Sequence, residues 1–202
     1  MNDPTRVAIF VFDEVEVLDF AGPFEVFGVT GWRAPPQPFD VFLVAAGDRR
    51  VTARNGLEII ARHTFADCPP IDILVIPGGW GSRTQLARDD VITWVRSTAA
   101  AAELTASVCS GALILAKAGQ LRDGPATTHH GAYDELRTLD PSIRVIEGVK
   151  MVDRGDVVTS GGISAGIDMS LGVVARLLGS AIAQETADYM EYDWTPAKVG
   201  IH

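Results

Sequence analysis

Cysteine is scarce in this sequence, and long apolar segments are missing. Only two of the 202 residues are cysteine, Cys68 and Cys109, so no disulfide framework is expected and both thiols are predicted to be reduced. The apolar run at 7–12 is far too short for a secretion signal or a membrane-spanning helix. We therefore expect a cytoplasmic protein with no membrane partner.

Basic residues are also few. The 17 lysines and arginines stand against 26 aspartates and glutamates, and the formal net charge is −9. Nucleic-acid binding needs a basic patch, so this charge argues against it. The four histidines and two cysteines show no spacing typical of a metal site. The adjacent His129 and His130 would point to opposite faces of a strand, so they would not chelate one ion together.

The remaining composition is that of an ordinary globular protein, with 47% hydrophobic and 21% charged residues. A length of 202 residues suits one α/β domain with a substantial core. No repeat, low-complexity tract or linker divides the chain. We therefore expect a single domain over residues 1–202.

Apolar, β-branched runs alternate with helical patterns along most of the chain. The runs typical of strands covered on both faces are 6–12, 40–45, 71–76 and 104–108. The predicted helices are 23–28, which opens with a proline, 90–102, 111–117, 164–178 and 181–192. Three further strands are predicted at 144–146, 150–153 and 156–160, and the turn at 153–156 has the composition of an antiparallel hairpin. This order predicts a mostly parallel sheet with helices on both faces.

Cys109 lies on the sharp turn between the strand at 103–108 and the helix at 111–117. Such a turn exposes its side chain above the sheet, beside the free N–H groups of the new helix. Those groups and the positive end of the helix dipole predict a lowered thiol pKa and a nucleophilic role. The alternative is a packing role, because free cysteine is often buried.

Several residues beside Cys109 in the expected site can contribute to its chemistry, and two of them have alternative interpretations. Ser110 offers a hydroxyl beside the thiol, or caps the following helix, and both roles are compatible. Gly78 and Gly79 follow a central strand, where their N–H groups are expected to face a ligand as part of an oxyanion hole. Asp19 is an isolated carboxylate among apolar residues, which favours a raised pKa and a general-acid role. Its alternatives are a cap for the helix that begins at Pro23, or a solvated loop acid.

Other polar residues are expected to be mainly structural. Glu14 and Glu16 are predicted to be ordinary surface charges. In the small-residue segment 159–168, Ile163 is expected to form a pocket wall and Asp168 a buried polar group of a helix. His129 belongs to a polar cluster at an expected strand end, where a structural role is favoured over catalysis. We expect it to lie among the substrate-binding residues with Gly78, Gly79 and Ile163.

Several motifs, in order over almost the whole chain, resemble the ThiJ/PfpI superfamily and, within it, its isocyanide hydratase branch. They are Val17-Leu-Asp-Phe-Ala-Gly-Pro23, Phe65-Ala-Asp-Cys-Pro-Pro-Ile-Asp72, Ile76-Pro-Gly-Gly79, Ser107-Val-Cys-Ser-Gly-Ala-Leu-Ile-Leu115, Ala126-Thr-Thr-His129 and Gly161-Gly-Ile-Ser-Ala-Gly-Ile-Asp168. The resemblance implies a flavodoxin-like α/β sandwich, a homodimer, no metal or organic cofactor and a small-molecule substrate. By motif, Cys109 is the nucleophile, Asp19 the carboxylate facing it and Ser110 the adjacent hydroxyl, with Ile163 packed near the cysteine.

The departures from other branches favour isocyanide hydration to an N-substituted formamide. Protease, chaperone and deglycase branches typically carry glutamate where this chain has Asp19, and protease-like members carry histidine where it has Ser110. Isocyanide hydratases usually have threonine at the Ser110 position and often tryptophan at the His130 position. For Cys68, which precedes two prolines and lies inside a matching motif, we favour packing.

Other functions remain open. A glyoxalase- or deglycase-like enzyme would use the same cysteine, and an accessible thiol can serve as a redox sensor. The same domain also forms the sensor half of some helix-turn-helix regulators, but the acidic charge argues against a DNA-binding role.

Overall fold

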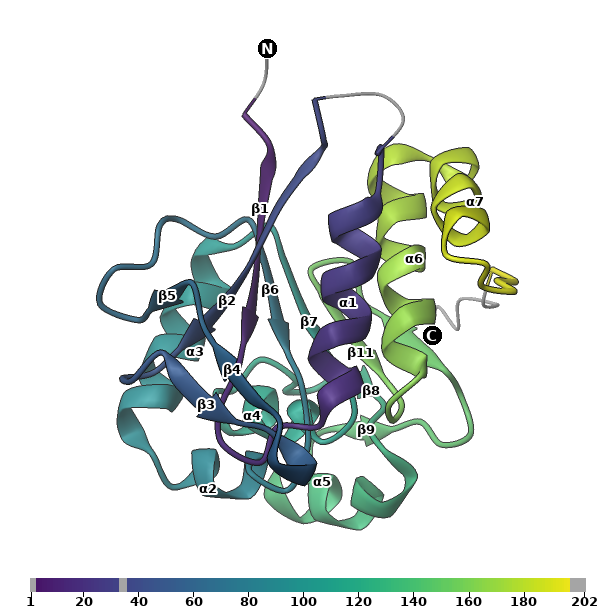
Figure 1. Cartoon of the computed structure of the whole chain (residues 1–202). Coiled ribbons are helices and arrows are strands. Elements are labelled where there is room, and N and C mark those ends of the chain that lie inside the picture. Colours follow the sequence, from purple (N-terminus) through teal and green to yellow (C-terminus); the bar gives the residue numbers. More distant parts are fainter. Residues whose placement is uncertain (1–2, 33–35, 197–202) are drawn as a thin grey trace.

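The computed structural model describes residues 3–32 and 36–196, and a seven-stranded sheet forms its centre (Figure 1). The strand order is β10-β11-β7-β6-β1-β2-β5. The bounds are β1 Thr5–Phe10, β2 Phe39–Ala45, β5 His63–Thr64, β6 Ile73–Ile76, β7 Leu104–Ser107, β10 Met151–Asp153 and β11 Val157–Ser160. Every pairing within it is parallel except β10–β11. The predicted mostly parallel sheet and the antiparallel hairpin after residue 150 are confirmed.

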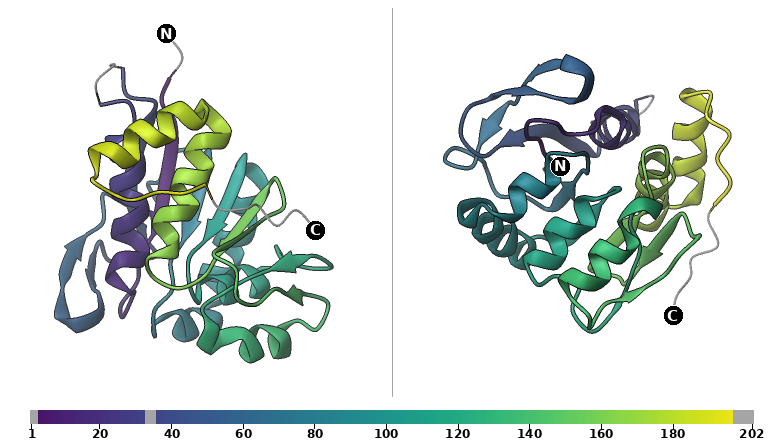
Figure 2. Two further views of the ribbon diagram at one scale, coloured as in Figure 1. Left: turned by 90° about the vertical axis from the view of Figure 1, so that its right-hand side faces the viewer. Right: turned by 90° about the horizontal axis from the view of Figure 1, so that it is seen from below.

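Helices cover both faces of this sheet, as Figures 1 and 2 show. On one face α1 packs against α6, and α7 packs on the outside of α6. On the other face α4 packs against β6 and β7, with α2, α3 and α5 around it. The bounds are α1 Val17–Val29, α2 Ser82–Leu86, α3 Asp89–Ala101, α4 Gly111–Lys117, α5 Tyr133–Leu139, α6 Ala165–Leu178 and α7 Ser180–Tyr189. This is the predicted flavodoxin-like three-layer sandwich.

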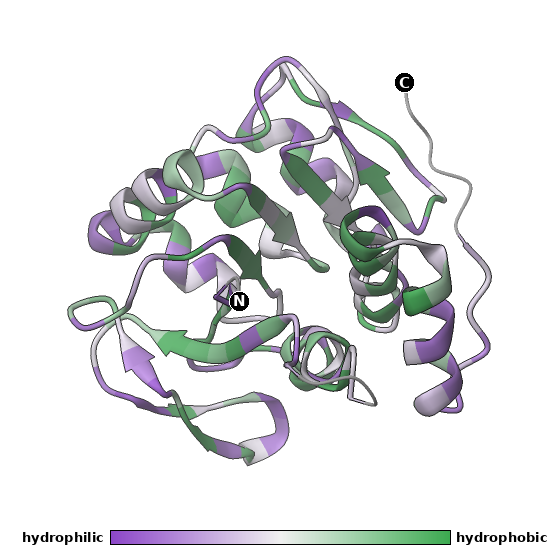
Figure 3. Cartoon of the chain, turned by 90° about the horizontal axis from the view of Figure 1, so that it is seen from above, coloured by the Kyte–Doolittle hydropathy of each residue, from purple (hydrophilic) through white to green (hydrophobic). Residues whose placement is uncertain are grey.

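The central strands are apolar on both faces because both faces are covered. All four residues of β6, β7 and β11 are buried, as are the last four of β1. Figure 3 shows the hydrophobic colour concentrated in the strands and the hydrophilic colour on the outer helix surfaces. Burial of this continuous apolar core is the main force that holds the sheet between its helix layers.

The prediction that the first helix begins at Pro23 is wrong. Helix α1 begins at Val17 and carries Pro23 in its interior, where proline removes one backbone hydrogen bond. Its buried residues, which follow a helical spacing, are Asp19, Phe20, Gly22, Pro23, Val26 and Phe27. Packing of this stripe against the sheet and α6 offsets the cost of the internal proline.

Several elements lie outside the predicted set, although β9, Arg144–Val145, coincides with the strand predicted at 144–146. A small antiparallel hairpin joins β3, Arg50–Thr52, to β4, Glu58–Ile60, across the short helix η1, Arg54–Gly56. Strand β8, Pro125–Ala126, pairs with β9 in a separate two-stranded sheet. In the described residues, no helix is long and apolar enough to cross a membrane. Both cysteines are free.

Candidate functional site

The turn between β7 and α4 holds Cys109 in a left-handed backbone conformation. Its φ is 57°, a value that residues with a Cβ rarely adopt. The Cys109 N–H donates to the carbonyl of Gly161 at 3.0 Å, and the Thr128 hydroxyl donates to the Cys109 carbonyl at 2.7 Å. These bonds fix the strained residue from both sides, and only 8% of its surface is exposed. The side chain is therefore held in one place at the carboxyl end of the sheet.

Asp19 comes from the first turn of α1 and is completely buried. Its Oδ2 accepts a hydrogen bond from the Gly78 N–H at 3.0 Å. Burial raises the pKa of Asp19 to about 7, although contacts with Gly78, the Cys109 thiol and the Ile163 amide favour the charged form. The raised pKa predicted from its apolar surroundings is confirmed. The cap and the solvated loop acid are both excluded, because Glu16 precedes the helix and Asp19 lies inside it.

The prediction of a lowered thiol pKa is contradicted. Burial and the charge of Asp19 raise the pKa of Cys109 to about 12, and the Ser110 amide and hydroxyl lower it by less. The position at a helix start is therefore outweighed by desolvation and by a nearby carboxylate. Two groups this closely coupled titrate as a pair. Above pH of about 7 the pair holds one proton, which either the thiol or the carboxyl group can carry.

Ser110 connects the turn between β7 and α4 to the loop that follows β6. Its hydroxyl accepts from the Gly79 N–H at 3.1 Å and lies 3.0 Å from the Ser82 hydroxyl. It precedes α4 but makes no side-chain capping bond to that helix. The Ser110 side chain therefore does not cap α4 by a hydrogen bond, and its hydroxyl lies near the thiol.

The N–H groups of Gly78 and Gly79 are not free to bind a ligand, contrary to expectation. Asp19 accepts the first and Ser110 the second, because both side chains turn toward this loop. Both positions still require glycine. A Cβ at Gly78 would lie 2.5 Å from the Ser110 nitrogen, and Gly79 has a φ of 113°. The loop after β6 thus lies close enough to the turn between β7 and α4 to couple Asp19, Cys109 and Ser110.

Ile163 and His129 complete the surroundings of the thiol. Ile163 has a φ of 56°, its amide favours the charged form of Asp19 and so lowers the pKa of that carboxyl group, and 39% of its surface remains exposed. His129 Nδ1 accepts from the Gly131 N–H at 3.1 Å, and the pKa of His129 is lowered, mainly by burial. Because Nδ1 is an acceptor, the neutral ring carries its proton on Nε2. His129 therefore lines the site and also caps the short helix η2, His130–Ala132.

These side chains meet in a cavity of about 310 Å³. Its lining residues are Glu16, Gly79, Trp80, Arg83, Cys109, Ser110, His129, Gly131, Ala132 and Ile163. The structure thus brings Cys109, Ser110, Gly79, His129 and Ile163 to one cavity, with Asp19 directly behind the thiol. Gly78 lies behind the wall and reaches the site only through Asp19.

The sequence analysis missed five lining residues, which are Glu16, Trp80, Arg83, Gly131 and Ala132. Glu16 lines the cavity and contributes to the raised pKa of Asp19, so its interpretation as an ordinary surface charge is wrong. Trp80 and Arg83 come from the loop after β6 and from α2, a helix that was not predicted. Their only signal in the sequence is that Trp80 directly follows Gly79 and Arg83 comes three residues later.

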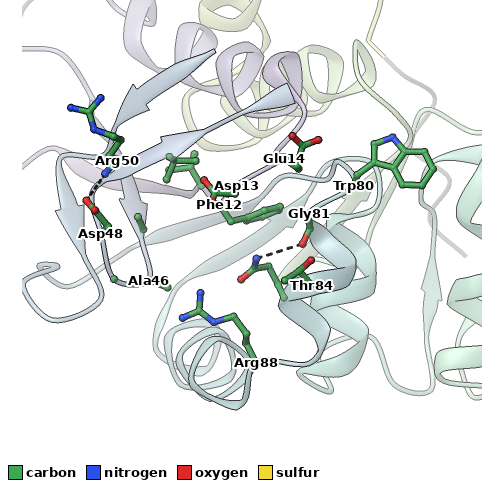
Figure 4. Close-up of a pocket in the computed structure, with 15 residues that line it drawn as sticks. Phe12, Asp13, Glu14, Ala46, Asp48, Arg50, Trp80, Gly81, Thr84 and Arg88 are labelled. Atoms are coloured by element: carbon green, nitrogen blue, oxygen red, sulfur yellow. Dashed lines mark hydrogen bonds between the residues drawn. The ribbon is translucent and has the colours of Figure 1, made fainter. Parts of the chain in front are cut away.

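A larger cavity, of about 580 Å³, lies beyond Trp80 and is shown in Figure 4. Its wall carries charged side chains, among them Asp48, Arg50 and Arg88, and no cysteine or histidine. No group of three or more His, Cys, Asp or Glu side chains within residues 3–32 and 36–196 has a metal-binding arrangement. We therefore place the candidate active site in the smaller cavity, where a thiol meets a carboxylate.

Two residues with other expected roles lie away from this cavity. Asp168 is 3% exposed, in α6, where it accepts hydrogen bonds from Lys150 at 3.0 Å and from Tyr192 at 3.1 Å. It is a buried helix residue, as expected. Cys68 is partly buried against the core, and burial raises its pKa to about 11.

Comparison with known proteins gives one family and several named relatives. The model of the DJ-1/PfpI family matches residues 5–176. An isonitrile hydratase from Pseudomonas putida is 35% identical over 191 residues, which is 95% of this chain and 80% of the relative. The transcriptional regulator GbdR from Pseudomonas aeruginosa is 22% identical, over 95% of this chain and 52% of its own length. A deglycase from Pyrococcus horikoshii is 23% identical, over 82% of this chain and 92% of the relative.

Comparison with solved structures leads to the same family. The crystal structure of a ThiJ/PfpI family protein from Pseudomonas syringae superposes with a TM-score of 0.85 and is 29% identical. The match covers 96% of this chain and 77% of that one.

Proposed function

The chain belongs to the DJ-1/PfpI family, and within that family we propose that it is an isocyanide hydratase-like enzyme. It would add water to an organic isocyanide, also called an isonitrile, and form an N-substituted formamide. The observation that carries this proposal is the pair formed by Cys109 and the buried Asp19, whose pKa is about 7. The isonitrile hydratase at 35% identity supports the same reaction.

The first step joins the thiol to the terminal carbon of the isocyanide. At neutral pH the pair holds one proton, and Asp19 takes it from Cys109 as the substrate enters. The thiolate sulfur then attacks the isocyanide carbon while Asp19 returns the proton to that same carbon. A carbon–sulfur bond and a carbon–hydrogen bond form, and the product is a thioimidate on Cys109. No redox partner is required.

The second step releases the formamide. Asp19 is ionised again and accepts a proton from a water molecule that attacks the thioimidate carbon. Asp19 passes that proton to the nitrogen, and the carbon–sulfur bond breaks as the carbonyl forms. The second proton of the water returns to the Cys109–Asp19 pair, and the N-substituted formamide leaves. The Ser110 N–H and hydroxyl favour negative charge on the sulfur, so they stabilise the departing thiolate.

The geometry suits a carboxylate partner better than an imidazole. The neighbours that shift the pKa of Cys109 are Asp19 and Ser110, whereas His129 is occupied at Nδ1 by the Gly131 amide. A glyoxalase- or deglycase-like reaction on small α-oxoaldehydes is the second candidate, favoured by the deglycase relative. That reaction would use the same thiol.

An assay with purified protein separates the two candidates. We expect p-nitrophenyl isocyanide to be converted to N-(p-nitrophenyl)formamide, and methylglyoxal to be turned over slowly or not at all. Consumption of methylglyoxal without formation of the formamide would refute the hydratase proposal.

Three further properties belong to this proposal. We infer that the protein acts as a homodimer, in the cytoplasm, on a small molecule and without nucleic acid. The −9 charge supports the last point, and the two free thiols support a reducing compartment. Size-exclusion chromatography with light scattering tests the dimer directly.

A further inference from the structure

We propose that Trp80 selects isocyanides whose substituent is a flat aromatic ring, an inference that rests on the proposed hydratase function. Trp80 lines the cavity of Cys109, and 66% of its surface is exposed. Tryptophan is usually much more buried than this in a folded protein. An exposed indole at the mouth of a reactive cavity is a surface on which a ligand can stack.

The indole ring is held in place from one side. The guanidinium of Arg83 lies 5.6 Å from the ring centroid, and Arg83 also forms a 2.7 Å ion pair with Glu135 of α5. This chain of contacts fixes the ring at a cavity wall without covering both of its faces. Trp80 lies between the two cavities and also lines the larger one, where Figure 4 shows its ring projecting away from Asp48, Arg50 and Arg88.

The shape of an isocyanide directs its substituent toward the cavity mouth. The C–N–C axis is linear, so a carbon that reaches the buried thiol leaves the substituent on the outer side. The exposed apolar side chains available to it are Trp80 and the half-exposed Ile163. Of the two lining residues with a π-system, Trp80 and His129, Trp80 is the more exposed, and Nδ1 of His129 already accepts from the Gly131 amide. A flat aromatic ring therefore gains more from stacking on Trp80 than a saturated ring does.

Phenyl isocyanide and cyclohexyl isocyanide provide a matched pair of substrates, because both carry a six-membered ring but only one is flat and aromatic. We expect Trp80→Leu to lower kcat/KM for phenyl isocyanide about tenfold more than for cyclohexyl isocyanide. Trp80→Phe keeps an aromatic face and should recover most of that difference. Equal losses for both substrates in Trp80→Leu would overturn the inference.

Trp32→Leu is the matched control. Trp32 is also partly exposed, but its ring packs at a tilt against Tyr189 with 4.5 Å between ring centroids, and it lies outside the cavity lining. The control should leave the phenyl-to-cyclohexyl ratio unchanged. A change as large as that of Trp80→Leu would mean that the ratio reports general stability and would refute the role of Trp80.

Measuring how the formamide products bind tests the aromatic selection by Trp80 independently of the hydratase activity. N-phenylformamide and N-cyclohexylformamide can be titrated calorimetrically into the wild type and Trp80→Leu, whether or not isocyanides are hydrated. We expect a tighter complex with N-phenylformamide in the wild type only. Absence of that preference would refute the aromatic selection, whereas preference without isocyanide turnover would refute the hydratase proposal alone.

Discussion

The two cysteines of this chain differ in their carboxylate neighbours more than in their own acidity. Burial raises both pKa values, to about 11 for Cys68 and about 12 for Cys109. Beside Cys68 stands Asp67, whose pKa falls to about 2 because the Thr64 amide and hydroxyl hold its charge. Beside Cys109 stands Asp19, whose pKa rises to about 7.

This difference decides which thiol can react. A carboxylate with a pKa of about 2 cannot take a proton from a thiol, and its charge only opposes thiolate formation. A buried carboxyl group with a pKa of about 7 is a proton partner at neutral pH. Low thiol pKa is therefore not the property that distinguishes the candidate nucleophile. The distinguishing property is a neighbouring carboxyl group that can exchange a proton with the thiol.

The largest expected effect comes from removing each thiol in turn. Cys109→Ala should lower isocyanide kcat/KM by about 10⁴-fold or more, because no covalent intermediate can form. Cys68→Ala should stay within about twofold of the wild type, since its side chain only packs. Steady-state assays with both variants, with circular dichroism as a folding check, measure the contrast. Similar activity in the wild type and Cys109→Ala would remove the thiol from the mechanism.

The second contrast concerns how Asp19 and Asp67 each make the free energy of unfolding depend on pH. The pKa of Asp19 in the folded protein lies above its ordinary value of 3.8. The contribution of Asp19 to the free energy of unfolding is therefore complete below pH 3.8 and is lost as pH rises through about 7. Relative to Asp19→Asn, the wild type should lose about 4 kcal/mol of unfolding free energy across that range. Urea unfolding at several pH values measures this.

Asp67→Asn is the control for that experiment. Its lowered pKa places any change in stability below pH 3.8, as pH falls toward about 2. Relative to this variant, the wild type should therefore show a constant difference between pH of about 4 and 7. A falling difference for Asp67→Asn, or a flat one for Asp19→Asn, would contradict the contrast between the carboxylates.

Alkylation compares the two thiols without any substrate. Iodoacetamide at neutral pH should modify Cys109 about tenfold faster than Cys68, because Asp19 can accept the thiol proton. Peptide mass spectrometry follows both sites in one sample. If exposure or thiol pKa alone set the rate, the less buried Cys68 would react first.

The smallest expected effect belongs to Ser110. Ser110→Ala leaves the Gly79 N–H without its acceptor and should cost about 1 kcal/mol of unfolding free energy. Ser110→Thr keeps the hydroxyl and should recover most of that loss. Denaturant titration distinguishes the two variants, and equal losses would indicate that volume matters here instead of the hydrogen bond.

Much of this site was predictable from local sequence, but the direction of the pKa shift at Cys109 was not. The strand-to-helix turn identified Cys109, and the isolation of Asp19 among apolar residues predicted its raised pKa. The sign of the shift at Cys109 depends on Asp19, which reaches the thiol only because α1 folds against the sheet. A local rule for helix starts cannot contain that contact.

Two of the missed residues, Glu16 and Trp80, share one physical cause. The loop before α1 is bridged to the loop after β6 through Val15 and Gly79, and this bridge brings Glu16 and Trp80 to the cavity. Pairing of two loops far apart in the chain leaves no periodic pattern in the sequence. The start of α1 was missed for a different reason, because Pro23 resembles a helix start and the buried stripe before it was not recognised.

The pH dependence of isocyanide hydration in the wild type and Asp19→Asn tests the central claim most directly. We expect wild-type kcat/KM to rise through an apparent pKa near 7, where the pair loses its first proton and Asp19 can activate the thiol. Asp19→Asn should lack that rise and be about 10²–10⁴-fold slower on its plateau. An unchanged rise near pH 7 in Asp19→Asn, with wild-type rates, would contradict the carboxylate–thiol mechanism.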